Sequence, residues 1–243
     1  MIPKKIHYCW FGGKPKSALA LKCIKSWETN CKDYEIIEWN KKNFDLHSNR
    51  YVWEAYQEKK WAFVSDYVRL YVLYQYGGVY LDTDVEVIKP FDFFRNGKAF
   101  IGFESHSRVQ TGVIASESHQ QFIGRLLKIY DHKRFIQDDK SLDLTANVEL
   151  VTNEFLKSGL VLNGKKQVIE GITVYPTEFF CPKDFKTRKL RITENTYMIH
   201  HFDGSWIPAD KKIKSRIAVL IGPRITNLLI YVKRKISKLR KRK

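Results

Sequence analysis

The chain has 243 residues, of which 44% are hydrophobic and 14% are aromatic. This composition supports a large core in one main domain and excludes a globally disordered chain. The formal net charge is +17, and such an excess usually favours an anionic partner: nucleic acid, a membrane surface or a phosphorylated ligand.

The positive charge is concentrated near the C-terminus. Residues 211–243 hold 13 Lys+Arg and no Asp or Glu, so the first 210 residues hold 30 Lys+Arg against 26 Asp+Glu, a net charge of +4. A folded surface that binds nucleic acid needs a basic face. Because residues 1–210 are nearly neutral, we expect no nucleic-acid partner, and binding of DNA by those residues alone would contradict this.

The four cysteines show no metal-ligand spacing. So few cysteines in a chain of this length do not make a disulfide framework, which favours a reducing compartment. The first residues lack the apolar segment of a secretory signal, and no run reaches the ~18 apolar residues of a membrane-spanning helix. We therefore expect a cytoplasmic protein.

The first hundred residues predict strands that alternate with helices. The expected strands are Ile2–Phe11, 34–39 and one beginning at 79–81, and the expected helices are 15–31, 51–59 and 61–76. Gly12-Gly13 ends the first strand, and Gly77-Gly78 ends the third helix. This alternation predicts an α/β fold class with a mostly parallel sheet, whose ligands bind at the carboxyl ends of the strands.

The second half of the chain has a weaker pattern. We expect strands at 99–104, 113–116, 172–175 and 197–201 and helices at 119–130 and 146–157. No internal repeat or low-complexity linker precedes residue 210, so we expect one domain over 1–210 and a separate tail over 211–243.

Asp82 and Asp84 follow the strand at 79–81 and form an Asp-x-Asp motif. Two like charges in a partly desolvated place repel each other, and a divalent cation removes that cost. Oxygen ligands suit Mg²⁺ or Mn²⁺. Such a short motif alone is more often a solvated turn, but its place after an apolar strand favours the ligand end of the sheet.

The helix before that strand contains Ser65, Asp66 and Arg69. The spacing of Asp66 and Arg69 places them one turn apart on one helix face. By themselves they indicate a surface ion pair. Leu70 and Leu73 indicate instead that the helix is largely buried, where charged residues need partners or a ligand.

Two further groups of residues are candidates for binding a metal or a ligand. Either His200 or His201 is suited to complete a metal site, with Ser205 and Trp206 available to a phosphate or sugar. The alternative is one packed and one solvated histidine. Trp10 is suited to stack on a nucleobase, although a tryptophan on a strand is more often part of the core.

Four ordered blocks of this sequence resemble the glycosyltransferase family 32 enzymes, which include bacterial capsular polysaccharide enzymes and yeast α-mannosyltransferases. The blocks are IPKKIHYCWFG at 2–12, AxxSDxxR at 62–69, GGVYLDxD at 77–84 and HHFDGSW at 200–206. They also resemble the glucosyltransferase domains of large clostridial toxins. The resemblance implies a GT-A (Rossmann-like) nucleotide-sugar-binding fold, a nucleotide-sugar donor, a divalent metal, usually Mn²⁺, and retention at the anomeric carbon.

The resemblance also implies roles for residues that match these blocks. Trp10 would stack on the nucleobase, Asp66 and Arg69 would bind the donor sugar, and Ser65 and Tyr80 would join this donor site.

In the same way, Asp82 would contact the ribose and the metal region, and Asp84 would ligate the metal directly. One of His200 and His201 would complete the metal shell. Ser205 and Trp206 would hold the diphosphate. The middle of the chain matches poorly, and only 145–147 offers a further guess for the donor side.

Three other interpretations remain open. In a haloacid-dehalogenase-type phosphatase, Asp82 would be the nucleophile and Asp138 with Asp139 a late metal pair. In that case the Ser65–Arg69 segment and the Gly77-Gly78 pair that ends the third helix would have no function. The second is a nucleic-acid-binding protein, which the near-neutral body disfavours. The third is an inactive transferase-like module, which the intact Asp-x-Asp motif and Arg69 disfavour.

The tail combines apolar blocks at 217–221 and 225–232 with basic clusters at 211–216 and 233–243. This pattern favours an amphipathic helix on an anionic membrane surface, and Pro223 would break a helix that ran through it. The alternatives are packing on the body and self-association into a homo-oligomer. We therefore expect a peripheral protein at the inner face of the cell membrane that acts on a lipid-linked glycan acceptor in capsular or surface polysaccharide synthesis.

Overall fold

The computed structural model describes residues 1–204. The chain divides into two compact units: Met1–Lys183 with Leu190–Phe202, and Asp184–Lys189 with Asp203–Lys243. Every helix and strand below belongs to the first unit. In the described part of the second unit, the Asp184 carboxylate accepts a hydrogen bond from the Thr187 backbone N–H at 2.6 Å. The predicted tail and the boundary at residue 210 lie outside the described residues.

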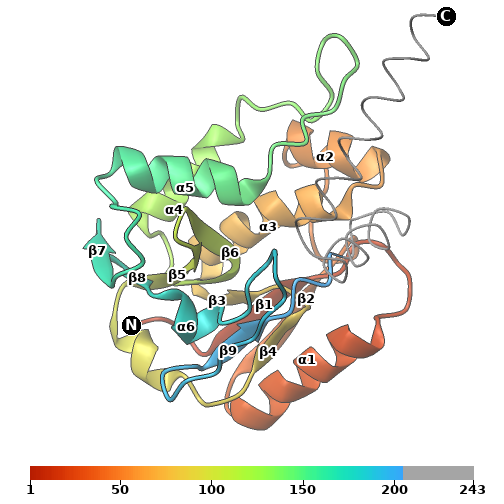
Figure 1. Cartoon of the computed structure of the whole chain (residues 1–243). Coiled ribbons are helices and arrows are strands. Elements are labelled where there is room, and N and C mark those ends of the chain that lie inside the picture. The colour runs from red at the N-terminus through yellow and green to blue at the C-terminus, as the bar shows by residue number, and fades with distance from the viewer. Residues whose placement is uncertain (205–243) are drawn as a thin grey trace, which may run out of the picture. The chain divides into compact units, whose positions relative to one another are not determined.

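A seven-stranded sheet forms the centre of the first unit (Figure 1). Its strands in spatial order are β2 (Glu35–Trp39), β1 (Lys5–Cys9), β3 (Gly78–Leu81), β6 (Arg108–Ser116), β5 (Ala99–Ser105), β8 (Ile172–Tyr175) and β7 (Gln167–Ile169). The pairs β1–β2, β1–β3 and β5–β8 are parallel, and β3–β6, β5–β6 and β7–β8 are antiparallel.

The sheet is therefore mixed, and the expectation of a mostly parallel sheet is correct for β1, β2 and β3 and for the β5–β8 pair, but not for the rest. β5 and β6 are joined as a hairpin, and a hairpin needs no crossover helix. The sequence pattern did not reveal this hairpin, because β6 extends back to Arg108 while its apolar run becomes clear only from Val113.

Helices cover both faces of the sheet (Figure 1). One face carries α2 (Arg50–Gln57), α3 (Trp61–Tyr76), α4 (Gln121–Ile129) and α5 (Asn147–Lys157). The other face carries α1 (Ala18–Asn30), the 3-10 helix η1 (Asp92–Asn96), α6 (Thr177–Phe180) and a two-stranded sheet of β4 (Val85–Val87) and β9 (Met198–His200).

The apolar core accordingly has two layers, one on each side of the sheet. Along β6, Ile114 packs into the layer under α3 and α5, whereas Val113 and Ala115 pack into the opposite layer. This alternation is the period-two pattern of a strand buried on both faces. All four cysteines are buried free thiols.

Local chemistry sets the ends of the helices that lead to the site. α1 begins at Ala18 rather than at Pro15, because the Ser17 hydroxyl accepts a hydrogen bond from the Ala20 backbone N–H at 3.1 Å and caps the helix. α3 ends where predicted, at Gly77. Gly77 has a φ of +63°, and a Cβ there would lie 2.7 Å from the Ser118 backbone nitrogen, so glycine is required at this turn.

No helix within residues 1–204 is both long and apolar enough to cross a bilayer.

Candidate functional site

Asp82 is held at the carboxyl end of β3. Its backbone N–H donates a hydrogen bond to the Gly112 carbonyl at 2.8 Å, which continues the β3–β6 ladder by one step. Its carboxylate accepts a hydrogen bond from the Tyr80 hydroxyl at 3.0 Å and lies 3.4 Å from Nη2 of Arg69. Asp82 is therefore fixed at both its backbone and its side chain.

Arg69 is only 4% exposed, and several partners surround its guanidinium. Nη2 lies 2.9 Å from Asp66, Nη1 donates to the Thr111 carbonyl at 2.7 Å, and the group lies 4.8 Å from the centre of the Tyr80 ring. The predicted pairing of Asp66 and Arg69 on one helix face is thus present. A charge this deeply buried persists only with such partners, and they leave Arg69 rigidly placed beside Asp82.

A bulge in β6 makes this arrangement possible. Residues 110–113 of β6 lie opposite the single residue Gly102 of β5, because the pairing shifts register there. The bulge frees the carbonyls of Thr111 and Gly112 from the β5–β6 ladder, and they bind the Arg69 guanidinium and the backbone that follows β3. Bulges commonly occur beside functional sites, where they redirect the chain.

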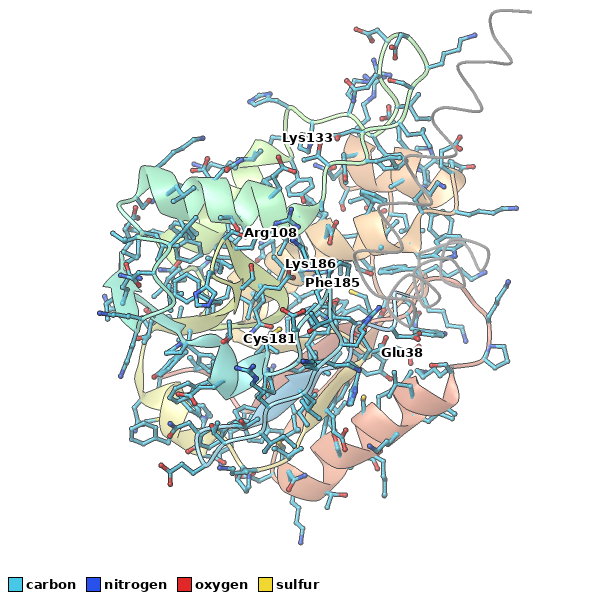
Figure 2. The ribbon with its side chains drawn as sticks, in the orientation of Figure 1. Glu38, Arg108, Lys133, Cys181, Phe185 and Lys186 are labelled. Atoms are coloured by element: carbon cyan, nitrogen blue, oxygen red, sulfur yellow. The ribbon has the colours of Figure 1, made fainter. Side chains whose placement is uncertain are left out.

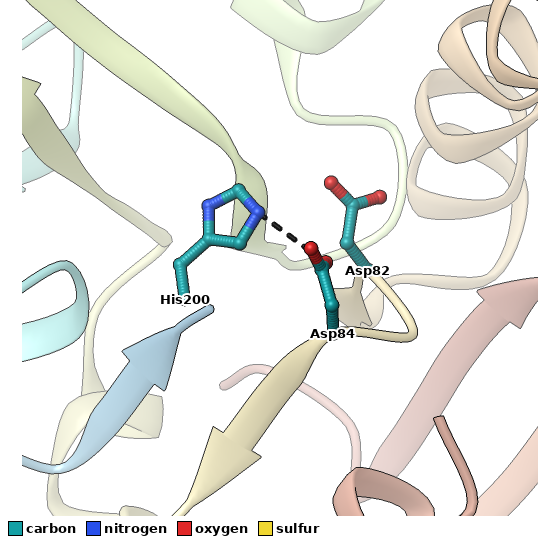
Figure 3. A group of neighbouring side chains, drawn as sticks. All are labelled: Asp82, Asp84 and His200. Carbon is teal, nitrogen blue, oxygen red and sulfur yellow. Dashed lines mark ion pairs between the residues drawn. The ribbon is translucent and has the colours of Figure 1, made fainter. Parts of the chain in front are cut away.

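Asp82, Asp84 and His200 form a cluster whose candidate ligand atoms lie within 4.8 Å of one another. Pairing of Val85 with His200 brings the two chain segments together, and His200 Nε2 lies 3.3 Å from the Asp84 carboxylate (Figure 3). A Cβ on Gly112 would lie 2.9 Å from the His200 ring and 3.1 Å from the Asp82 carboxylate. The cluster therefore occupies a cradle that only glycine leaves open.

The charges of the cluster fit a cation. Burial opposes a positive charge on His200, but Asp84 nevertheless holds the pKa of the His200 imidazole well above its usual range. A carboxylate that draws a proton onto a buried histidine also attracts a metal ion, which would take the place of that proton. Two carboxylates and one imidazole are a donor set that suits a divalent cation.

The structure distinguishes the two neighbouring histidines. His200 lies in the cluster, whereas the His201 ring nitrogen Nε2 lies 2.8 Å from the Glu86 carboxylate, which also pairs with Lys22 at 2.9 Å. Successive residues of a strand face opposite sides. The structure therefore does not place His201, one of the two predicted metal ligands, at the cluster.

Burial also changes the proton affinity of Asp66. It raises the pKa of this carboxyl to about 6, although Arg69 acts in the opposite direction. The Asn147 side chain donates a hydrogen bond to the Asp66 backbone carbonyl at 3.4 Å. Asn147 is the first residue of α5, so the segment 145–147 does reach the site.

Trp10 lies at the carboxyl end of β1 and is half-buried rather than part of the core. Its indole N–H donates to the Lys14 carbonyl at 2.7 Å. It borders an open cleft of about 410 Å³ whose lining also includes Lys16, Glu38 and Asn40; Figure 2 labels Glu38. Further lysines at this cleft, Lys14, Lys41 and Lys42, favour an anionic ligand.

The remaining predicted residues are placed as follows. Tyr80 is buried under Arg69, and the Ser65 hydroxyl donates to the Trp61 carbonyl at 3.0 Å. Ser205 and Trp206 lie outside the described residues. Asp138 is 97% exposed and pairs with Arg134, so it is not part of the Asp82 cluster that the phosphatase interpretation requires.

Sequence comparison matches the segment that carries Asp66, Arg69, Asp82 and Asp84. A family model described as a glycosyltransferase sugar-binding region containing the DXD motif matches residues 17–101. Inositol phosphoceramide mannosyltransferase 3 of Schizosaccharomyces pombe is 26% identical over 139 residues, which cover 52% of this chain and 36% of that protein. The chain thus spans about a third of the length of this curated relative.

Two solved structures share the fold. The PaToxG glycosyltransferase has a TM-score of 0.50 at 18% identity, with 64% of this chain and 68% of that chain covered. A glycosyltransferase involved in glycosylation of the major capsid of PBCV-1 has a TM-score of 0.50 at 12% identity, with 87% and 98% covered. The mixed sheet, with the Asp-x-Asp motif where β3 ends, has the GT-A fold of these two glycosyltransferases. Over the matched segment, the chain is similar to glycosyltransferase family 32-type proteins.

Proposed function

We propose that this chain moves a sugar from a nucleotide-sugar donor, with a UDP-sugar favoured, to a glycan acceptor, with retention at the anomeric carbon. The observation that carries the proposal is the cluster of Asp82, Asp84 and His200 next to the buried Arg69–Asp66 pair. Both lie where β3 ends, at the edge of the sheet where ligands of such folds bind.

The donor would be held from two sides. Trp10 offers an aromatic face to the base, and the lysines of its cleft attract the phosphates. Asp66 and Arg69 orient the sugar by hydrogen bonds, and their rigid placement lowers the entropic cost of alignment.

Asp82, Asp84 and His200 would hold Mn²⁺ or Mg²⁺, which when bound neutralises the charge that develops on the departing nucleoside diphosphate. In a retaining transfer the acceptor attacks on the side from which the diphosphate leaves. The diphosphate can then accept the proton of the attacking hydroxyl, so the chain needs no separate base.

The cellular role that we propose is synthesis of a capsular or surface polysaccharide on a lipid-linked acceptor, at the inner face of the cell membrane. It is supported by the basic and apolar composition of residues 211–243, which suits an anionic membrane. Flotation with anionic liposomes tests it: replacing the Lys and Arg residues of 233–243 by Gln should abolish flotation. Equal flotation of this variant and the natural protein contradicts it.

The activity is tested by incubating the purified full chain with a panel of UDP- and GDP-sugars, with and without Mn²⁺. We expect metal-dependent release of nucleoside diphosphate from one donor, and loss of that release in Asp84→Ala. Asp138→Ala, which removes an exposed carboxylate, is the matched control and should react normally. Normal turnover by Asp84→Ala, or no cleavage of any donor, would overturn the assignment.

The same assay distinguishes the glycosyltransferase hypothesis from the phosphatase hypothesis. A phosphatase would cleave phosphoesters and form a phospho-aspartate at Asp82. The transferase would release a nucleoside diphosphate without modification of the chain.

A further inference from the structure

Glu104 is a carboxylate near the cluster that has no partner in the described part of the chain. It lies near the end of β5 and is half-buried. Within residues 1–204, no side chain or backbone N–H donates a hydrogen bond to it, and no cation pairs with it. The other acidic groups here have partners: Asp66 and Asp82 contact Arg69, Asp84 contacts His200, and Glu86 contacts Lys22.

The strand places Glu104 beyond the apolar core, near the end of β5. Alternate residues Phe100, Gly102 and Glu104 share one face of β5. Phe100 packs against Phe180 of α6, and a Cβ on Gly102 would lie 3.1 Å from the Phe180 ring. This face therefore leads from the apolar core to Glu104, at the end of the strand.

Glu104 interacts electrostatically with two members of the cluster. Burial raises the pKa of its carboxyl, while His200 and Arg108 lower it and Asp82 raises it. Glu104 also acts on the thiol of Cys181, the residue that follows α6; Arg108 and Cys181 are both labelled in Figure 2. The carboxylate thus lies in the electrostatic range of His200 and Asp82, yet it is not one of the residues that form the metal cluster.

The face of β5 next to Glu104 is covered at Gly102. Gln110 belongs to the bulge of β6, and its side chain extends over Gly102. A Cβ on Gly102 would lie 2.9 Å from Nε2 of Gln110. Gln110 is completely buried, and neither of its amide atoms has a partner among the described residues. Since Gln110 does not bind Glu104, the carboxylate remains available to a group that arrives from outside.

We propose that Glu104 binds the glycan acceptor by accepting a hydrogen bond from the hydroxyl that attacks the donor sugar. A partly desolvated carboxylate without a donor is unfavourable, and a sugar hydroxyl supplies the missing donor without adding charge. This proposal rests on the proposed function. In the transfer the hydroxyl oxygen forms the new bond to the anomeric carbon, and the bond from that carbon to the diphosphate breaks. The electron pair leaves with the diphosphate, and the hydroxyl proton moves from its hydrogen bond with Glu104 to a diphosphate oxygen as the new bond forms, so Glu104 stays ionised.

The test uses water as the smallest hydroxyl acceptor, so it requires no knowledge of the glycan. Hydrolysis of the donor that the natural chain cleaves best is measured for Glu104→Ala and Glu104→Gln, with Glu149→Gln, an exposed carboxylate on α5, as control. We expect kcat to fall at least about tenfold in Glu104→Ala and less in Glu104→Gln, which keeps an acceptor oxygen without the charge. The KM for the donor should not change.

A calorimetric titration with Mn²⁺ in the presence of UDP separates acceptor binding from metal binding. We expect both Glu104 variants to bind Mn²⁺ as the natural chain does, whereas Asp84→Ala should not bind it. An unchanged kcat in Glu104→Ala, or a loss of Mn²⁺ affinity in the Glu104 variants, overturns the proposal. If the natural chain cleaves no donor, the proposed function itself fails, and that result is distinct from either outcome.

Discussion

The Gly112 backbone touches the His200 imidazole so closely that a Cβ at position 112 would lie 2.9 Å from Cε1 of the ring. Real Cβ atoms do not approach other atoms this closely, so a side chain here displaces either His200 or Asp82, which lies at 3.1 Å. We expect Gly112→Ala to weaken Mn²⁺ binding at least about tenfold, because a ligand held out of position loses its bond. Calorimetric titration of the folded variant measures this.

Gly97 provides the matched control for that substitution. The nearest heavy atoms to a Cβ at Gly97 would lie 3.9 Å away, and its φ is −83°. Gly97→Ala should therefore retain full Mn²⁺ affinity and gain a few tenths of a kcal/mol, roughly, in stability. If Gly112→Ala binds Mn²⁺ as well as Gly97→Ala does, the cradle does not control the metal site.

The two adjacent histidines should respond differently to alanine. His200→Ala removes a member of the cluster, so we expect a loss of Mn²⁺ affinity of about 10- to 100-fold. His201→Ala removes the contact with Glu86, which lies outside the cluster, and we expect Mn²⁺ affinity to change less than about threefold. Manganese titrations of the two variants compare them directly, and an equal loss in both would show that His201 also ligates the metal.

Arg69 should be essential for stability as well as for donor binding. Arg69→Leu keeps a side chain of similar bulk but leaves the Asp66 and Asp82 carboxylates without their buried counter-charge. We expect the free energy of unfolding to fall by about 3–5 kcal/mol. Urea denaturation at pH 7 measures this loss. A variant as stable as the natural chain would show that the two carboxylates do not need Arg69 as a counter-charge.

His7 should make stability depend on pH. Trp39 donates its indole N–H to His7 Nδ1 at 3.1 Å, so Nε2 carries the proton and donates to the Gly77 carbonyl at 2.8 Å. Burial lowers the pKa of His7 from 6.5 to about 4. Between these values the unfolded chain binds a proton that the folded chain does not, so the free energy of unfolding decreases as the pH falls from 6.5 to 4.

The size of this effect is about 3 kcal/mol over that range. Urea denaturation at a series of pH values should show a shallower loss for His7→Gln than for the natural chain. His132→Gln, at an exposed position, is the control and should follow the natural curve. Identical pH profiles for all three chains would mean that His7 is not held neutral.

The parts of the fold that were predictable have strong local patterns. α3 has the predicted bounds because a continuous apolar stretch ends at Gly77. The short elements β4, β7 and α6 have three or four residues each, which is too few for a periodic pattern to be visible. They depend on tertiary pairing, as β4 does on β9.

The same distinction applies to the site. Asp66, Arg69, Asp82 and Asp84 were predictable because each is part of a motif of fixed spacing that follows or precedes a recognisable element. The roles of Gly112 and Glu104 were not, because both depend on the register shift between β5 and β6. The glycine in QTG at 110–112 is a sequence signal that indicates a bulge. The choice between His200 and His201 required the pairing of β9 with β4.

The three-residue pairing of β9 with β4 has a thermodynamic consequence. Asp82 and Asp84 precede β4, and His200 ends β9. An ion bound by all three residues therefore has a higher affinity for the chain with β9 paired to β4 than for the chain with β9 separated. By linkage, the ion then stabilises the docking of β9 by the same free energy that the docking adds to ion affinity. Hydrogen exchange of the β9 amides should therefore slow as Mn²⁺ is added.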